Sequence, residues 1–440
     1  MFKKQLACAL AGVSIALSMA AGVSAAVEPP PADAGFPLAI RIERTAGAEK
    51  SLGTFVERVW DRSPVVQQAK AALEAAQARA VGAARPLYNP ELEVETERTD
   101  VDTVAIGVNQ TMDWSRQREA LAEIAGGEVE VAQAALSQIR QQIAAEALDA
   151  LVRYATARAR RDLARQRTVL MKRFAKAVAQ RREAGDMDAL DDSLARMAYT
   201  EALMQEAESD SLQAEAQADL FAVSGLAEKD WPAVPARLSG PPSAVPEDLL
   251  ASLPSLRVLR QQWDVAKARA ELARRQRRPD PTFGLRAGRE DSETLLGISV
   301  ALPLYVRNNF SAEAAAALHD ALAAEQAYRD AYRRAKARLD LALARYRNTV
   351  QAWEAWLANG QEAYHQQAGL LDRLWQTGEL TATDYLIQAR QNVETLDAAI
   401  ALAGELWRAA VAWQVASGQV EQWLGVVPRV AEPDSGAVGP

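Results

Sequence analysis

The stretch that decides the fold is residues 91–97, which read Glu91-Leu92-Glu93-Val94-Glu95-Thr96-Glu97. Apolar or β-branched side chains alternate with glutamates, so a strand formed here has one apolar face and one acidic face. Residues 103–113, 283–288 and 296–304 alternate in a similar way. The sequence therefore predicts four amphipathic strands, in two groups about 190 residues apart.

Long proline-free blocks follow each pair of strands, and they predict long helices. Residues 116–184 predict one helix of about 100 Å, and residues 64–84 and 187–224 predict shorter ones. Apolar residues with steps of four and three form a heptad pattern, which demands a partner helix. This pattern is followed by Leu339, Leu343, Tyr346, Val350, Trp353 and Leu357; by Leu386, Ala389, Val393, Leu396, Ile400, Ala403 and Trp407; and, with Glu201 interrupting, by Leu190, Leu194, Met197 and Met204.

Matching landmarks divide the chain into two similar halves. Ser63-Pro64, Asn89-Pro90, 106–108 and 184–186 recur in order as Leu253-Pro254, Asp280-Pro281, 296–298 and 377–379. We therefore expect a first repeat over 51–230, a Pro-rich linker over 231–247 and a second repeat over 248–427. Residues 1–26 predict a signal peptide, because Lys3 and Lys4 precede an apolar run that ends in small residues. Residues 27–50 and 428–440 predict flexible ends.

Composition excludes several classes of function. The net charge of −8 argues against nucleic acid as a partner. The single cysteine, Cys8, lies inside the predicted signal peptide, so no disulfide or thiolate site is expected in the exported chain. The sequence shows no phosphate loop, zinc-ligand spacing or nucleophile elbow. It therefore predicts no enzyme, no cofactor and no metal site.

The strands raise a problem of closure. One reading is a hairpin whose apolar face packs on a protein core; the other is an outer-membrane β-barrel. The export signal and the charged opposite face favour the barrel, but four strands are too few, since such barrels have at least eight. Open strand edges are not stable in hydrocarbon. Several chains must then share one barrel, and three chains supply twelve strands.

These segments resemble the TolC family of outer-membrane factors over nearly all of the exported chain, with the cobalt–zinc–cadmium efflux branch as the nearest match. The resemblance is carried by 89–92, 280–285, 296–305 with Arg307-Asn308-Asn309, and the two turns at 184–186 and 377–380. It implies a mainly α fold with a small β part. The expected assembly is a homotrimer with a 12-stranded barrel in outer-membrane lipid, continuous with a periplasmic α-helical barrel.

The same resemblance implies the function and the partners. We expect a passive duct of a tripartite system, working with a periplasmic adaptor and an inner-membrane RND-type pump, and exporting heavy-metal cations. A duct for organic solutes or for protein secretion shares this architecture. From another class, an exported coiled-coil scaffold or adhesin remains an alternative, and it predicts a product extracted without detergent.

Two groups of residues are candidates for the working parts. The turns at Gly185 and Gly378 predict the periplasmic entrance and the adaptor-docking tips, and their acids serve either as helix caps or as a collar that attracts cations. These acids are Asp186, Asp188, Asp191 and Asp192 at the first turn, and Glu379 and Asp384 at the second. The candidates for the duct lining are Glu91, Glu93, Glu95, Glu97 and Asp113, which either select cations or provide a polar wall.

Aromatic residues near the strand ends have two readings as well. Tyr88, Trp114 and Tyr305 suit the interface between membrane and water, where aromatic side chains are enriched. Core packing is the alternative for all three.

Overall fold

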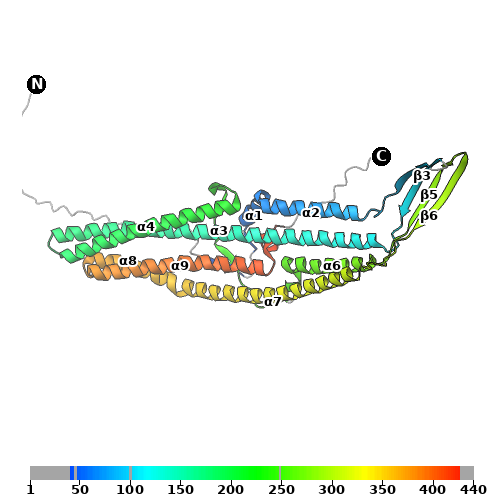
Figure 1. Cartoon of the computed structure of the whole chain (residues 1–440). Helices are drawn as coiled ribbons and strands as arrows, with labels where there is room; N and C mark the ends of the chain where they lie inside the picture. Colours follow the sequence, from blue (N-terminus) through cyan, green and yellow to red (C-terminus); the bar gives the residue numbers. More distant parts are fainter. Residues whose placement is uncertain (1–39, 44–46, 99–101, 247–248, 427–440) are drawn as a thin grey trace, which may run out of the picture. The chain divides into compact units, whose positions relative to one another are not determined.

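The computed structural model describes residues 40–43, 47–98, 102–246 and 249–426. Helices make up most of these residues, together with one two-stranded and one four-stranded sheet (Figure 1). The predicted signal peptide at 1–26 and the predicted tail at 428–440 lie outside the described residues. Among the described helices, none combines the length and the apolar character that a membrane crossing needs.

The first half of the chain alternates short elements with two long helices. Its order is β1 (Arg41–Glu43), α1 (Lys50–Arg62), α2 (Pro64–Ala83), β2 (Glu91–Arg98), β3 (Asp102–Thr111), α3 (Gln117–Glu183) and α4 (Ala189–Ser224). Pro64 stands in the first turn of α2, where its missing N–H costs nothing, and the Ser63 hydroxyl accepts from Val66 N. With 67 residues, α3 is about 100 Å long, as predicted.

The second half repeats this order with one interruption. A short helix η1 (Glu228–Asp230) and β4 (Arg237–Ser239) lead into α5 (Leu249–Ser252), α6 (Pro254–Arg275), β5 (Thr282–Glu290), β6 (Glu293–Ala301) and α7 (Ser311–Ala355). A π-helical turn η2 (Trp356–Gly360) then separates α7 from α8 (Gln361–Thr377), followed by α9 (Ala382–Ala416) and α10 (Val420–Leu424). The chain therefore stays helical from Ser311 to Thr377, as predicted for the second long helix, with one π-helical turn inside it.

The helices lie side by side in a fixed order, with α3 inside the layer (Figure 1). Near the four-stranded sheet, α3 lies between α2 and α6, and α6 packs against α7. Toward the other end, α3 lies between α4 and α9, and α9 packs against α8 and α7. The layer consequently has one edge formed by α2 and α4 and another formed by α7 and α8.

The predicted seam residues behave differently in the two halves. In α7, Leu339, Tyr346 and Trp353 are fully buried, which confirms the heptad prediction there. In α4 the predicted seam residues are not covered by another helix of the described chain: Leu190, Met197 and Met204 are 66, 67 and 63% exposed.

The α3–α4 contact instead uses small residues of α4 and polar pairs. Ala195 and Ala202 are fully buried, and Thr168 Oγ1 donates to the carbonyl of Ala202 at 3.2 Å. Arg165 of α3 pairs with Asp210 of α4 at 3.0 Å. Because alanine lets two helix backbones approach closely, the longer side chains on the adjacent face of α4 stay outside the contact.

A core around the middle of the layer includes parts of the predicted flexible segment and of the predicted linker. Within 27–50, expected to be flexible, β1 pairs in parallel with β4, and Ile40 is fully buried. Within 231–247, expected to be a linker, β4 contributes the buried side chain of Leu238. Trp353 Nε1 donates to the Ile40 carbonyl at 2.9 Å. These two segments therefore belong to the core that joins the halves.

The four-stranded sheet is antiparallel and has the order β2-β3-β5-β6. Its register places the predicted apolar residues on one face, where Val94 is opposite Ile106 and Leu285 is opposite Ile298. All four side chains are more than half exposed, and Ile298 is 82% exposed. No helix or strand of the described chain covers this face, so the reading of a hairpin packed on its own core is wrong.

Candidate functional site

The polar face of the sheet carries the four predicted glutamates. Glu91, Glu93, Glu95 and Glu97 stand on the same side of β2, opposite Asn109, Gly107, Ala105 and Thr103 of β3. Gly284 and Gly288 of β5 also lie on this face, on either side of Arg286, and a Cβ at Gly288 would lie 2.2 Å from the carbonyl oxygen of Val104. The glutamates project from this face, where solvent or a solute can approach them.

Two of these glutamates already have partners. Glu95 forms an ion pair with Arg286 of β5 at 3.2 Å, and Glu93 accepts from the Asn109 amide at 2.8 Å. Arg286 lowers the net negative charge of this face, which the sequence pattern of β2 alone did not reveal. The role of the four glutamates in lining a duct stays a prediction.

Asp113 does not belong to this face, in contrast to the prediction. It lies beyond the end of β3, and its carboxylate accepts from the backbone N–H groups of Gln117 at 2.7 Å and Arg118 at 2.9 Å. These donors open α3 and have no partner within the helix, and an acid near them also suits the helix dipole. Asp113 is therefore an anchor for the start of α3.

A buried carboxylate, Asp280, joins the sheet to the helices. It is 6% exposed and lies two residues before β5. Its Oδ1 accepts from the backbone N–H of Ser115 at 3.0 Å and from the Ser115 hydroxyl at 2.9 Å. Its Oδ2 accepts from the Tyr88 hydroxyl at 3.0 Å and from the Gln117 amide at 2.9 Å. Three segments far apart in sequence thus meet on one side chain.

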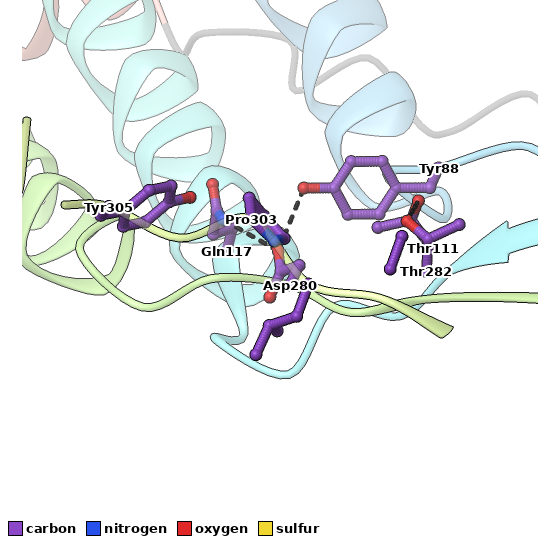
Figure 2. A pocket seen from close by; sticks show the side chains of 9 residues that line it. Tyr88, Thr111, Gln117, Asp280, Thr282, Pro303 and Tyr305 are labelled. Atoms are coloured by element: carbon purple, nitrogen blue, oxygen red, sulfur yellow. Dashed lines mark hydrogen bonds between the residues drawn. The ribbon is translucent and has the colours of Figure 1, made fainter. Parts of the chain in front are cut away.

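An open recess of about 440 Å³ lies beside Asp280. Figure 2 shows Tyr88 and Tyr305 on opposite sides of Asp280. The paired hydroxyls of Thr111 and Thr282 also line the recess. Burial, the hydrogen bond to Asp280 and the charges of Asp280 and Asp113 raise the pKa of Tyr88 to about 12. Tyr88 therefore keeps its proton at neutral pH and remains a donor to Asp280.

The first predicted tip is the turn between α3 and α4. Gly185 has a φ of 86°, as expected for a helix end of this kind, and Asp188 caps α4 by accepting from Leu190 N and Asp191 N, each at 2.8 Å. Asp186 is exposed and Asp191 half-buried. The capping reading is confirmed for Asp188, and it does not exclude a collar.

Asp192 has a different position from its neighbours at this tip. Only 5% exposed, it pairs with Arg182 at 2.6 Å and with Arg196 at 3.1 Å. The prediction that it belongs to an open acidic collar is therefore wrong. Since Arg182 lies at the end of α3, Asp192 fixes the closing angle of the hairpin.

The second predicted tip is the turn between α8 and α9. Gly378 has a φ of 79°, and Glu379 is exposed. Thr381 Oγ1 accepts from Asp384 N at 3.1 Å, and the Asp384 carboxylate lies 2.7 Å from the same hydroxyl. Asp384 is therefore part of a cap at the start of α9.

The two tips share one apolar cluster. Phe174 of α3 contacts Trp375 of α8 and Tyr385 of α9, with ring centroids 4.9 Å apart in both pairs. Above Trp375 lies the guanidinium of Arg181, 4.6 Å from the ring centroid, and it donates to the Trp375 carbonyl at 3.2 Å. The sequence did not predict this cluster, which makes the tips one packed unit rather than two separate hairpins.

The aromatic residues near the strand ends separate into two kinds. Trp114 is 69% exposed and contacts Phe283, which lies on the apolar face of the sheet. This position suits an interface between membrane and water. Tyr88 is instead bound to Asp280, and the ring of Tyr305 packs edge-on against the ring of Phe310, with the ring centroids 5.0 Å apart.

Within the described ranges, no three histidine, cysteine or acidic side chains gather as a metal site would require.

The amino-acid sequence from residue 56 to residue 226 matches the family model described as outer membrane efflux protein. This range begins in α1 and ends just after α4, so it contains the first strand pair and the first hairpin. The chain is therefore similar to this family over the first of its two halves.

A curated protein is also similar to part of the chain. A curated relative is the cobalt-zinc-cadmium resistance protein CzcC of Cupriavidus metallidurans, 29% identical over 240 residues. The aligned part covers 51% of this chain and 56% of CzcC, so the chain spans a little over half of the curated relative that it matches.

Solved structures show the same fold over most of the chain. The outer-membrane channel OprN has a TM-score of 0.72 with 18% identity, covering 87% of this chain and 94% of OprN. The Campylobacter jejuni outer membrane channel CmeC also has a TM-score of 0.72, with 12% identity and coverage of 87 and 91%.

The family match bears on two of the predictions. The model is described as an outer membrane efflux protein, which agrees with the predicted absence of catalysis and with the predicted location in the outer membrane.

Proposed function

We propose that this protein is the outer-membrane exit channel of a tripartite efflux system, and that three copies form one passive duct. Each copy contributes four strands to a 12-stranded barrel, and its helices form part of a helical barrel in the periplasm. One observation carries the proposal: the four-stranded sheet exposes an apolar face, and its edge strands β2 and β6 have no further strand paired to them among the described residues.

The edges require a partner when the sheet lies in lipid. Backbone N–H and C=O groups along β2 and β6 have no acceptors or donors in hydrocarbon, and each unsatisfied group there costs several kcal/mol. Pairing β6 of one copy with β2 of the next satisfies both edges at once. Repeating one such contact around an axis closes the ring.

The helices favour the same arrangement. The β2 edge continues into α2 and α4, and the β6 edge continues into α7 and α8. On α4, the exposed side chains of Leu190, Met197 and Met204 form a heptad stripe without a partner in the chain. A neighbouring copy would cover this stripe with its α7–α8 edge. Two copies reach the eight-strand minimum of known barrels, and the family resemblance favours three.

We further propose heavy-metal cations as the cargo, delivered by an inner-membrane RND-type pump through a periplasmic adaptor. The support is the similarity to CzcC, whose name assigns it to cobalt, zinc and cadmium resistance. The adaptor would bind the packed tips at Gly185 and Gly378, with the exposed acids Asp186 and Glu379 at its contact.

Cysteine cross-linking tests the pairing of the edges. The chain has one cysteine, Cys8, which lies in the predicted signal peptide, so introduced cysteines have no competitor in the exported form. Val94→Cys in β2 is combined with single cysteines placed in turn along β6. Oxidation should give linked dimers and trimers for one register, with no product for Val94→Cys alone. A purified protein that stays monomeric and leaves lipid bilayers non-conducting would refute the channel.

Growth of a deletion strain tests the cargo separately. Loss of resistance to cobalt, zinc or cadmium, restored by the intact gene, is expected. Unchanged metal resistance together with sensitivity to organic compounds would replace the metal cargo but keep the channel.

A further inference from the structure

The recess beside Asp280 has an unusual electrostatic feature. The carboxylate is buried, yet all of its hydrogen-bond donors are neutral groups of Tyr88, Ser115 and Gln117. The neighbouring arginines of α6 are bound elsewhere: Arg274 pairs with Glu271, and Arg275 pairs with Glu271 and Glu119. In the part of the chain that the structure describes, no cationic side chain forms an ion pair with Asp280. The recess therefore adjoins a buried carboxylate whose hydrogen-bond donors are all neutral.

Part of the recess is lined by the polar face of the sheet. Thr111, Thr282 and Ala301 stand opposite one another in the register of β3, β5 and β6, on the face that carries the glutamates. In the proposed channel this is the inner surface, at the level where strands give way to helices. A solute moving along the duct would pass the recess in every copy.

The lining has the chemistry to bind an organic cation. Each Asp280 oxygen already accepts two hydrogen bonds, so Asp280 supplies charge rather than a direct contact. The Tyr88 hydroxyl donates its proton to Asp280, and its oxygen can still accept a hydrogen bond. Gln117 donates to Asp280 through its side-chain nitrogen, and its side-chain amide oxygen can accept as well. The rings of Tyr88 and Tyr305 can face a cation, and Leu302 and Pro303 add apolar surface.

We propose that this recess binds an organic ammonium ion with small apolar substituents, and that it is a binding site on the inner wall of the duct. A half-apolar wall with two aromatic rings suits such an ion better than a hydrated divalent metal, which needs polar acceptors on all sides. Transition metals that shed their water prefer imidazole or thiolate ligands, and the recess has neither. The position on the inner wall rests on the proposed function, whereas the binding itself does not.

Choline and its neutral isostere, in which a quaternary carbon replaces the nitrogen, test the proposal by calorimetric titration of the purified full-length protein. Choline should bind at least about tenfold more tightly than the isostere, since a cation–π contact and a nearby carboxylate act on the charged ligand alone. Asp280→Asn should remove this preference, and Tyr305→Leu should weaken choline binding. Glu95→Gln is the matched control, because Glu95 pairs with Arg286 on the same face and does not line the recess.

Three results would overturn the inference. Equal binding of choline and the isostere would show an apolar crevice only, and unchanged choline binding in Asp280→Asn would remove the role of the charge. If zinc chloride displaces choline from the parent protein but not from Asp280→Asn, the recess is a site for a hydrated metal ion and not for an organic cation. If Asp280→Asn does not fold, Tyr305→Leu decides alone, since Tyr305 is not bound to Asp280. A protein that conducts as a channel but fails these tests refutes the recess and not the function.

Discussion

Placing one arginine on each face of the same strand tests which face of the sheet contacts lipid. Ile298 and Ser299 are neighbours in β6, near the middle of the strand, and both are exposed. Ile298 stands opposite Leu285 on the apolar face, and Ser299 stands opposite Gly284 on the polar face. Ile298→Arg and Ser299→Arg therefore add the same charge and the same side chain to opposite surfaces.

The expected difference follows from the depth of the residue. An arginine on the lipid face of a barrel costs about 2–4 kcal/mol near the bilayer midplane and about 0–1 kcal/mol near the interfaces. Ile298 lies beside the centre of a nine-residue strand, so the cost for Ile298→Arg should be near the higher range in each chain. This corresponds to a loss of about thirtyfold or more in the folding equilibrium. Ser299→Arg should change it by less than about tenfold, since the added charge stays in water.

Folding into lipid vesicles, followed by urea titration and by the gel mobility of unheated samples, measures both variants against the parent protein. Ile298→Arg should shift the urea midpoint down and reduce the fraction of assembled channel. Similar losses in both variants, or a larger loss for Ser299→Arg, would show that the apolar face does not meet lipid, and the barrel would have to be abandoned.

Three further predictions concern the inner wall, the tips and the junction. Changing all four glutamates of β2 to glutamine should lower cation selectivity in planar-bilayer recordings. Arg286, left without Glu95 as its partner, will also offset part of any negative charge that remains. Unchanged selectivity would show that β2 does not line the duct. Gly378→Ala should destabilise the tip by about 1 kcal/mol in chemical unfolding, because a residue with a Cβ is strained at the positive φ of Gly378 even though no neighbouring atom crowds the position. Gly369 lies inside α8 and is equally uncrowded, so Gly369→Ala should leave the free energy of unfolding unchanged or raise it. Equal effects of the two substitutions would contradict this prediction. Because the pKa of Tyr88 is raised to about 12 in the folded protein, the contribution of Tyr88 to stability should be present below pH 10 and lost as the pH rises toward 12. The unfolding midpoint of Tyr88→Phe should therefore fall less steeply over this pH range than that of the parent protein. Parallel plots of midpoint against pH for the two proteins would argue against the Tyr88–Asp280 hydrogen bond.

Local periodicity predicted most of the long elements correctly. Helix α3 was expected over 116–184 and runs from Gln117 to Glu183, and each expected strand lies within a few residues of an observed one. Such patterns act over neighbouring residues, so the chain itself contains the information. The two glycine turns were visible for the same reason, since positive φ is a property of single residues.

Contacts between distant segments could not be predicted in this way. The donors to Asp280 stand more than 160 positions earlier in the chain, and nothing in their local pattern distinguishes them. Strands β1 and β4 have three residues each, too few for an alternation to be recognised. The seam predicted on α4 is not covered within the described chain, because alanines on the adjacent face allow a closer contact with α3. Periodicity shows that a face is apolar but not which molecule covers it.

The unlike edges of the sheet have a genetic consequence. A chain with a damaged β6 can still offer an intact β2 to its neighbour, so it enters rings that it cannot seal. When half of the chains in a cell carry the damage, only about one in eight threefold rings is free of it. Alleles that break one edge should therefore act as dominant negatives, whereas alleles that prevent folding should be recessive.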